Sequence, residues 1–234
     1  MPKYKEIAED INKRIQEGNF QEKLPTEKEL LRIYHCSRNT IRSAINILVK
    51  QGSIHKIQGS GLYINKRIIN NRIVINLSLK VGLSSVLPEH KITSKVLDFT
   101  ILPANEKLAK QFDCPEGTPI YRVKRLRFLD EKPLSIEDAF YNKEIVRYLN
   151  RDIARQSIYQ YLVDDMKLNI RFSDEYISVI PLSREACRQL ELPEGSSSLE
   201  ISEIICLNNG AIFNISKTLY KPERVVLYTA VQRD

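Results

Sequence analysis

The sequence contains few of the residues that build metal sites, disulfide frameworks or membrane spans. Among its 234 residues there are four cysteines without close pairing and three scattered histidines, so neither a zinc ligand set nor a disulfide framework is indicated. No apolar run approaches the length of a membrane span, and charged residues occur within the first ten positions, which supports neither insertion nor export. We therefore expect a cytoplasmic protein with no metal, no other cofactor and no membrane partner.

Acidic residues are also absent from a long stretch near the N-terminus. No Asp or Glu occurs between Glu29 and Glu89, and residues 28–67 carry eight Lys or Arg against one acid. Residues 1–70 contribute +6 to the formal charge of +7, and residues 71–234 contribute +1. Each phosphate that pairs with a cation releases counterions, and a nearby carboxylate would oppose this pairing. The stretch therefore indicates a phosphate-binding surface rather than an ordinary solvated helical hairpin.

The stretch 24–64 has the pattern of two helices joined by a turn. Thr26 followed by Glu29 is a capping box, because the hydroxyl can accept a bond from the first turn while the carboxylate reaches back. After the turn, Ser37 can cap a second helix whose apolar positions follow the helical period, at Ile41, Ala44, Ile45 and Leu48. The opposite face of this helix is polar and carries Arg38, Asn39, Arg42, Ser43 and Asn46.

A hairpin and a further helix complete this pattern. Gly52 ends the second helix, and two short strands follow, joined by a turn at residues 59–61. Upstream, residues 4–17 place apolar side chains on one helical face, which we expect to pack under the other two helices. The sequence therefore predicts a winged helix-turn-helix with an outward-facing cationic helix.

These motifs resemble the DNA-binding domain of the GntR family of bacterial transcription regulators over residues 3–65. They are an aromatic residue at Tyr4, Leu-Pro-Thr-Glu at 24–27, Ser-Arg-Asn-Thr-Ile-Arg at 37–42 and Gly-Ser-Gly at 59–61. The resemblance implies double-stranded DNA contacts in the major groove and along the backbone from Lys28, Arg38, Asn39, Thr40 and Arg42. It implies wing contacts in the minor groove from Gln58 and Gly59. Lys28 stands where many relatives have Arg, the residue that can contact a guanine bidentately.

From about Ser94 onward, the chain contains an internal repeat with an offset of 78 residues. Six positions recur identically, namely Pro103, Gln111, Pro115, Glu116, Gly117 and Leu129, which return as Pro181, Gln189, Pro193, Glu194, Gly195 and Leu207. Each unit has the pattern of a strand, a short helix (104–112 or 182–190), a Pro-Glu-Gly turn and two strands joined by a tight turn. Two such units predict one antiparallel sheet with helices on a face. Further helical patterns at 143–149 and 157–165 make the predicted class α+β.

This second half resembles the UTRA domain, an effector-binding module with a chorismate-lyase-like fold in the HutC branch of the GntR family. The resemblance covers roughly residues 90–232 and rests on segments 93–97, 121–127, 133–141 and 157–159 with two closing tyrosines, Tyr220 and Tyr228. It implies that the anionic end of an effector lies against Thr93, Ser94, Arg125, Arg127, Ser157 and Tyr159. It implies that Glu137, Glu175, Ser216 and Tyr228 lie near the polar body of the ligand.

Arg125 and Arg127 point to an anion on their own chemistry. They lie two apart on a predicted strand, so their guanidinium groups project from the same face and can converge on a phosphate or carboxylate. The alternative is cross-strand salt bridges to Glu137 or Glu203. Other proposed contacts also have ordinary explanations: Ser157 as a helix cap, Tyr159 as a core aromatic, and Glu137, Glu175 and Ser216 as hairpin or surface residues.

The sequence thus predicts a winged helix-turn-helix at 1–70, a linker at 71–90 and a UTRA domain at 91–234, with residues 72–89 as the only covalent connection to the winged helix. We expect a repressor that binds a palindromic operator as a homodimer and is released by a small anionic metabolite, a sugar phosphate or a carboxylate. The alternatives are an enzyme of the chorismate-lyase-like fold and an architectural DNA-binding protein without an effector. Against an enzyme, the sequence shows no nucleophile-base pair and no metal ligand cluster, so we expect no catalytic residues.

Overall fold

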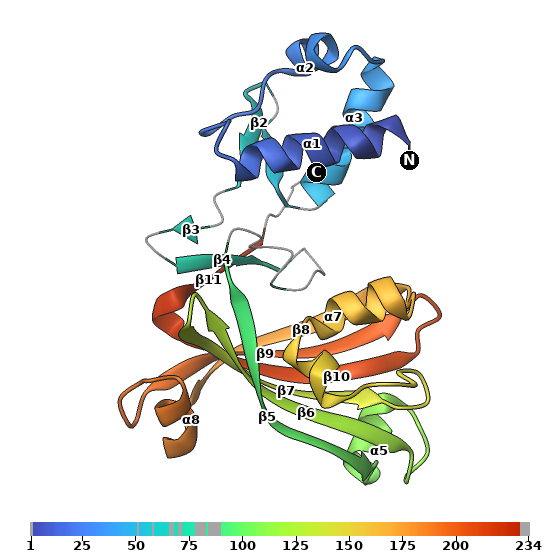
Figure 1. The fold of residues 1–234 in the computed structure, drawn as a ribbon, viewed down its shortest axis with the longest axis vertical. Helices are drawn as coiled ribbons and strands as arrows, with labels where there is room; N and C mark the ends of the chain where they lie inside the picture. Colours follow the sequence, from blue (N-terminus) through green and yellow to red (C-terminus); the bar gives the residue numbers. More distant parts are fainter. Residues whose placement is uncertain are drawn as a thin grey trace. The chain divides into compact units, whose positions relative to one another are not determined.

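The computed structural model describes residues 2–50, 52–57, 59–65, 68–69, 72–77, 83 and 90–229, without the side chains of Gln16, Lys50, Ile68, Ile69 and Asn76. The chain divides into two compact units. Unit 1 comprises residues 1–80 and 226–234, and unit 2 comprises residues 81–225. Figure 1 shows the elements of both units, coloured along the sequence.

Unit 1 begins with the three predicted helices, α1 (Lys3–Gln16), α2 (Glu27–Tyr34) and α3 (Arg38–Lys50). The predicted capping box forms, because Thr26 Oγ1 accepts from the amide of Glu29 at 3.3 Å and Glu29 Oε2 accepts from the amide of Thr26 at 2.8 Å. The hydroxyl of Ser37 accepts from the amide of Thr40 at 3.2 Å and so caps α3. The apolar faces of the helices meet in one core, formed by Ile7, Ala8, Ile11, Leu24, Leu30, Ile41, Ala44, Ile45, Leu48, Ile54 and Leu62.

The predicted wing is an antiparallel pair of strands, β1 (Ile54–Ile57) and β2 (Gly61–Ile64). Gly59 and Gly61 have φ angles of 74° and 126°, in the left-handed region that favours glycine, so the turn itself demands these two glycines. Asn65 fastens the end of the wing to the end of α3, because its side-chain amide donates to the carbonyl of Gly52 at 2.7 Å. The wing is therefore held against the helices by a polar contact as well as by the shared core.

A three-stranded sheet in the order β11-β4-β3 follows the wing. Its strands are β3 (Ile68–Ile69), β4 (Arg72–Asn76) and β11 (Val225–Tyr228). The amide of Leu77 donates to the carbonyl of Tyr228 at 2.9 Å. The chain thus returns from unit 2 and pairs with β4 by hydrogen bonds, a non-covalent contact that adds to the covalent connection expected through residues 72–89.

Unit 2 is built on a six-stranded antiparallel sheet in the order β5-β6-β7-β10-β9-β8. Its strands are β5 (Ile92–Pro103), β6 (Pro119–Leu129), β7 (Lys132–Asn142), β8 (Ile170–Pro181), β9 (Ser197–Leu207) and β10 (Ile212–Tyr220). The bounds of β5 and β8, and those of β6 and β9, differ by 78 residues at both ends. The internal repeat is confirmed. Its two copies, both within unit 2, meet where β7 pairs with β10.

Helices cover both faces of this sheet (Figure 1). α5 (Glu106–Phe112) and α8 (Arg184–Gln189), one from each repeat, pack on Ile120 and Leu126 respectively, which lie on the same face of β6. The segment between the repeats covers the other face, where α6 (Arg151–Arg155), α7 (Ile158–Gln160) and the π-helix η1 (Tyr161–Asp165) pack on Tyr121 and Val123. This second layer creates room for a pocket.

The segment between the repeats also contains one error of the sequence prediction. The expected helix at 143–149 is wrong, because this segment is a turn followed by irregular chain. Val146 and Leu149 are buried three positions apart, a spacing that imitates a helical period although both fill the core from non-helical backbone. The helix instead begins after Asn150, whose side chain accepts from the amide of Ile153 at 2.8 Å. The helical prediction at 157–165 is confirmed by α7 and η1.

Candidate functional site

The outward face of α3 and the adjoining edge of α2 form a cationic groove in unit 1. Lys28, Arg38 and Arg42 are exposed and line this groove, which has a volume of about 210 Å³, together with Glu27, Leu31 and Ile41. The fold therefore brings together three of the residues expected to contact DNA, while the buried side of α3 fixes the helix on the core. A helix presented in this way fits the major groove of B-DNA.

The other expected DNA contacts are placed less uniformly. Asn39 is exposed on the same helix, whereas Thr40 is half-buried and its hydroxyl lies 2.9 Å from that of Ser37 in the helix cap. Gly59 is exposed at the wing turn, and Gln58 lies outside the described residues.

Sequence reasoning missed Glu27, the acid at the start of α2. Its Oε2 accepts from Arg42 Nε at 3.2 Å, and its Oε1 accepts from Lys56 Nζ at 3.1 Å. The hydrogen bond from Lys56 is the largest effect on the pKa of Glu27 and lowers it. Burial opposes this shift, and the smaller effect of the Arg42 contact again lowers the pKa, which stays below its usual value. Glu27 belongs to the Leu-Pro-Thr-Glu motif, so its position was visible, but its partners become neighbours only through the fold.

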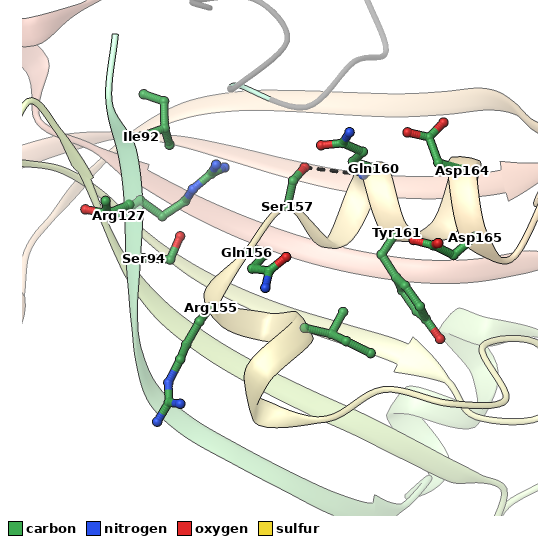
Figure 2. Close-up of a pocket in the computed structure, with 12 residues that line it drawn as sticks. Ile92, Ser94, Arg127, Arg155, Gln156, Ser157, Gln160, Tyr161, Asp164 and Asp165 are labelled. Carbon is green, nitrogen blue, oxygen red and sulfur yellow. Dashed lines mark hydrogen bonds between the residues drawn. The ribbon is translucent and has the colours of Figure 1, made fainter.

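Unit 2 contains a pocket of about 980 Å³ between the β5–β6 edge of the sheet and the helices α6, α7 and η1. Four of the expected effector contacts line it: Thr93, Ser94, Arg127 and Ser157. Figure 2 shows Arg127 and Ser94 on one side of Ser157, and Asp164 and Asp165 on the other. The lining residues that sequence reasoning missed are Ile92, Ile153, Arg155, Gln156, Gln160, Tyr161, Asp164 and Asp165.

Arg127 is one of the charged side chains that line this pocket, with Arg155, Asp164 and Asp165. Its Nε is buried and has no hydrogen-bond partner among the described residues, and its strand position lies directly opposite Ser94. Burial, followed by the like charge of Arg125, lowers the pKa of Arg127, yet a guanidinium remains protonated in proteins. Arg127 as a whole is partly exposed and lines the pocket, so its charge would stabilise an anion bound there.

Arg125 does not converge with Arg127 on the pocket, contrary to what the sequence predicted for these two arginines. Its guanidinium donates to Glu137 Oε2 from Nε at 3.1 Å and from Nη2 at 2.5 Å, and its Nη1 donates to the carbonyls of Ala154 and Gln156 at 3.0 Å each. Arg125 is 3% exposed and does not line the pocket. The salt-bridge alternative with Glu137 therefore describes its contacts, and Arg125 also bonds the sheet to α6 and to the residue after it.

Ser157 has a second role besides lining the pocket, whereas Tyr159, Glu175, Ser216 and Tyr228 do not line it. Ser157 both lines it and caps α7, because its hydroxyl accepts from the amide of Gln160 at 3.3 Å. Tyr159 is half-buried, and burial raises its pKa. Glu175 and Ser216 lie opposite Glu203 on either side of β9, with the Ser216 hydroxyl 3.4 Å from Glu203 Oε2. Tyr228 belongs to unit 1.

Two further features concern only the described part of the chain. Within it, no group of three or more His, Cys, Asp or Glu side chains is arranged to hold a metal ion. None of its helices is long and apolar enough to span a membrane.

Comparison with known proteins assigns the family. Residues 3–64 match the bacterial regulatory proteins of the gntR family, and residues 89–226 match the UTRA domain. The HTH-type transcriptional regulator YydK of Bacillus subtilis is 32% identical over 226 residues, which covers 96% of this chain and 95% of the relative. The mannosyl-D-glycerate transport/metabolism system repressor MngR of Escherichia coli is 28% identical over 235 residues, which covers 99% and 97%.

The fold agrees with this assignment. The crystal structure of YydK has a TM-score of 0.82 to this chain and covers 100% of both chains. The expected α+β architecture, a winged helix-turn-helix followed by a UTRA sheet domain, is thereby confirmed. The chain belongs to the GntR family of bacterial regulatory proteins, in its UTRA-containing HutC branch, and is a ligand-responsive DNA-binding transcription regulator rather than an enzyme.

Proposed function

We propose that this regulator is a cytoplasmic repressor that binds a palindromic double-stranded operator as a homodimer and is released by a small anionic metabolite such as a sugar phosphate. The observation that carries the effector proposal is the unpartnered, buried Nε of Arg127 at a pocket of about 980 Å³. This volume suits a ligand of the size of a sugar phosphate. The domain limits at 1–70, 71–90 and 91–234 belong to the same proposal.

We propose that four of the side chains expected at the anionic end touch the anion, those that line the pocket. Arg127 supplies the charge, and the hydroxyls of Thr93, Ser94 and Ser157 supply neutral donors around the same space. Arg125 and Glu137 support this end from behind, since the Arg125 guanidinium donates to the carbonyl of Gln156, a residue that lines the pocket. A phosphate or a carboxylate would satisfy this arrangement.

The effector class can be tested by titration. Calorimetry of the full chain with a panel of sugar phosphates, the parent sugars and sugar acids should show binding for anionic members only. Those that bind should also release the protein from operator DNA in a mobility-shift assay. Equal binding of a sugar and its phosphate would contradict an anion site at Arg127.

On the DNA side, we expect Arg38 and Arg42 to recognise sequence and Lys50 and Lys56 to contact mainly the backbone. Arg38 and Arg42 are separated by one helical turn on the exposed face of α3. Arg38→Ala or Arg42→Ala should lower affinity for the operator by about 1–3 kcal/mol and flatten sequence preference. Lys50→Ala should weaken all DNA alike and reduce the salt slope by about one. Fluorescence anisotropy at several salt concentrations measures both quantities, and a uniform loss in all three variants would refute the assignment.

We expect unit 2 to make the homodimer, because one winged helix reads a half-site and a palindrome needs two correctly spaced copies. A fragment lacking residues 1–70 keeps β4, the partner of β11, and should remain a dimer. Light scattering measures its mass. A monomeric fragment beside a dimeric full chain would place the interface in the winged helix instead.

A further inference from the structure

Glu27 is an acid in the middle of the cationic groove of unit 1. It lines that groove with Lys28, Arg38 and Arg42, the side chains expected to meet DNA. The next acid along the chain, Glu29, is occupied by the capping box of α2. A carboxylate among phosphate contacts opposes DNA binding, so its presence in this groove needs a physical explanation.

The contacts of Glu27 suggest what that explanation is. Each carboxylate oxygen takes one cation from a different element, Arg42 from α3 and Lys56 from the wing strand β1. Both cations are more than half exposed, and ion pairs of this kind contribute little to stability. A role in folding is therefore a weak explanation for the pairing.

The geometry at Arg42 is more informative. Glu27 binds the Nε side of the guanidinium, and no other hydrogen bond of Arg42 is seen among the described residues. The two terminal nitrogens therefore have no hydrogen-bond partner among the described residues, and the Arg42 side chain is 62% exposed. Guanine presents two acceptors, O6 and N7, to a pair of parallel N–H groups in the major groove. Fixing one edge of the guanidinium while leaving the other edge open favours such a two-bond contact over a loose phosphate contact.

We propose that Glu27 is a positioning residue for DNA recognition, which holds the side chains of Arg42 of α3 and Lys56 of the wing in fixed positions. Its negative charge lowers the electrostatic affinity for any DNA, and the fixed side chains raise the preference for the correct sequence. This inference rests on the DNA-binding function. It predicts that removing the carboxylate strengthens binding to unrelated DNA and at the same time lowers the preference for the correct sequence.

The test uses two duplexes, one selected by the full-length wild-type protein from a randomised pool and one with the same bases scrambled. Glu27→Gln should bind the scrambled duplex more tightly, steepen its salt slope by about one and lower the selected-to-scrambled affinity ratio on the order of ten-fold. Glu27→Asp keeps the charge but shortens the reach, so it should lower the ratio without changing the salt slope. Glu9→Gln, an exposed change on α1, is the control for charge alone.

The ratio of affinities for the selected and the scrambled duplex tests the positioning role of Glu27. An unchanged ratio in Glu27→Gln, with both duplexes bound more tightly as in the Glu9→Gln control, would overturn the positioning role. If Glu27→Gln unfolds at a lower temperature than the wild type, the affinity ratio of Glu27→Asp is used instead. A wild-type ratio in Glu27→Asp would also overturn the positioning role. A wild-type protein that enriches no sequence would instead refute the DNA-binding function itself.

Discussion

Arg127→Ala is expected to bind operator DNA as tightly as the wild type and to ignore the effector, which would give a permanently repressed phenotype. Arg127 provides the unpaired buried donor of the pocket, and it belongs to unit 2, whereas the DNA-facing side chains belong to unit 1. Truncating one partner of a buried hydrogen-bonded charge pair costs about 2–5 kcal/mol, so effector affinity should fall by more than ten-fold. Calorimetry with the effector and mobility shifts with the operator measure the two properties separately.

Arg155→Ala provides the matched control for this experiment. Arg155 also lines the pocket, but its side chain is 63% exposed and its Nη1 pairs with Asp152 Oδ1 at 2.7 Å. Its loss should change effector affinity much less than the loss of Arg127, because water screens its charge. Release of DNA from Arg127→Ala at unchanged effector concentrations would move the anion site elsewhere in the protein.

The second large effect is expected on stability, from Glu137→Ala. This change leaves Arg125, which is 3% exposed, without its carboxylate partner in the interior of unit 2. Removing one member of a buried ion pair typically costs about 3–5 kcal/mol. Urea unfolding of both proteins measures the difference. Asp138→Ala is the control on the same strand, because its bidentate pair with Arg122 is partly exposed and should contribute at most about 1 kcal/mol.

The pKa of Glu137 predicts how the stability difference between the wild type and Glu137→Ala changes with pH. Burial raises the pKa of its carboxyl, but the attractions of Arg125 and Arg127 outweigh burial and leave the pKa below its usual value. The contribution to stability is therefore complete above the unfolded-state pKa of about 4.3 and is lost as the pH falls through the folded-state pKa. The gap between wild type and Glu137→Ala should narrow in acid. Equal losses from Glu137→Ala and Asp138→Ala at neutral pH would contradict the special role of the buried pair.

The fold was largely predictable because its signals are local. The capping box at Thr26 and Glu29 and the glycines of the wing turn each specify a conformation within a few residues. The repeat offset of 78 residues predicted that one pattern of strands and a short helix occurs twice, and the observed bounds of β5 and β8 and of β6 and β9 differ by this offset. The helix expected at 143–149 failed where burial, rather than helical propensity, sets the spacing of apolar residues.

The site was less predictable because its contacts join distant parts of the chain. Arg125 and Arg127 look equivalent in the sequence, but the carbonyls that bind Arg125 come from Ala154 and Gln156, about 30 residues further on. Asp164 and Asp165, the acids at the far side of the pocket, lie on a π-helix that no short sequence motif predicts. Only tertiary packing distinguishes the structural arginine from the one that faces the pocket.

The pairing of β11 with β4 has a consequence for how the chain is made. A ribosome releases β4 early, but its neighbour β11 emerges only after every strand of unit 2 has been synthesised. Until then β4 carries one unpaired edge, which is open to association with other chains. The N-terminal unit therefore reaches its final hydrogen bonding only after unit 2 has left the ribosome, and nascent chains stalled between β4 and β11 are the species most exposed to misassembly.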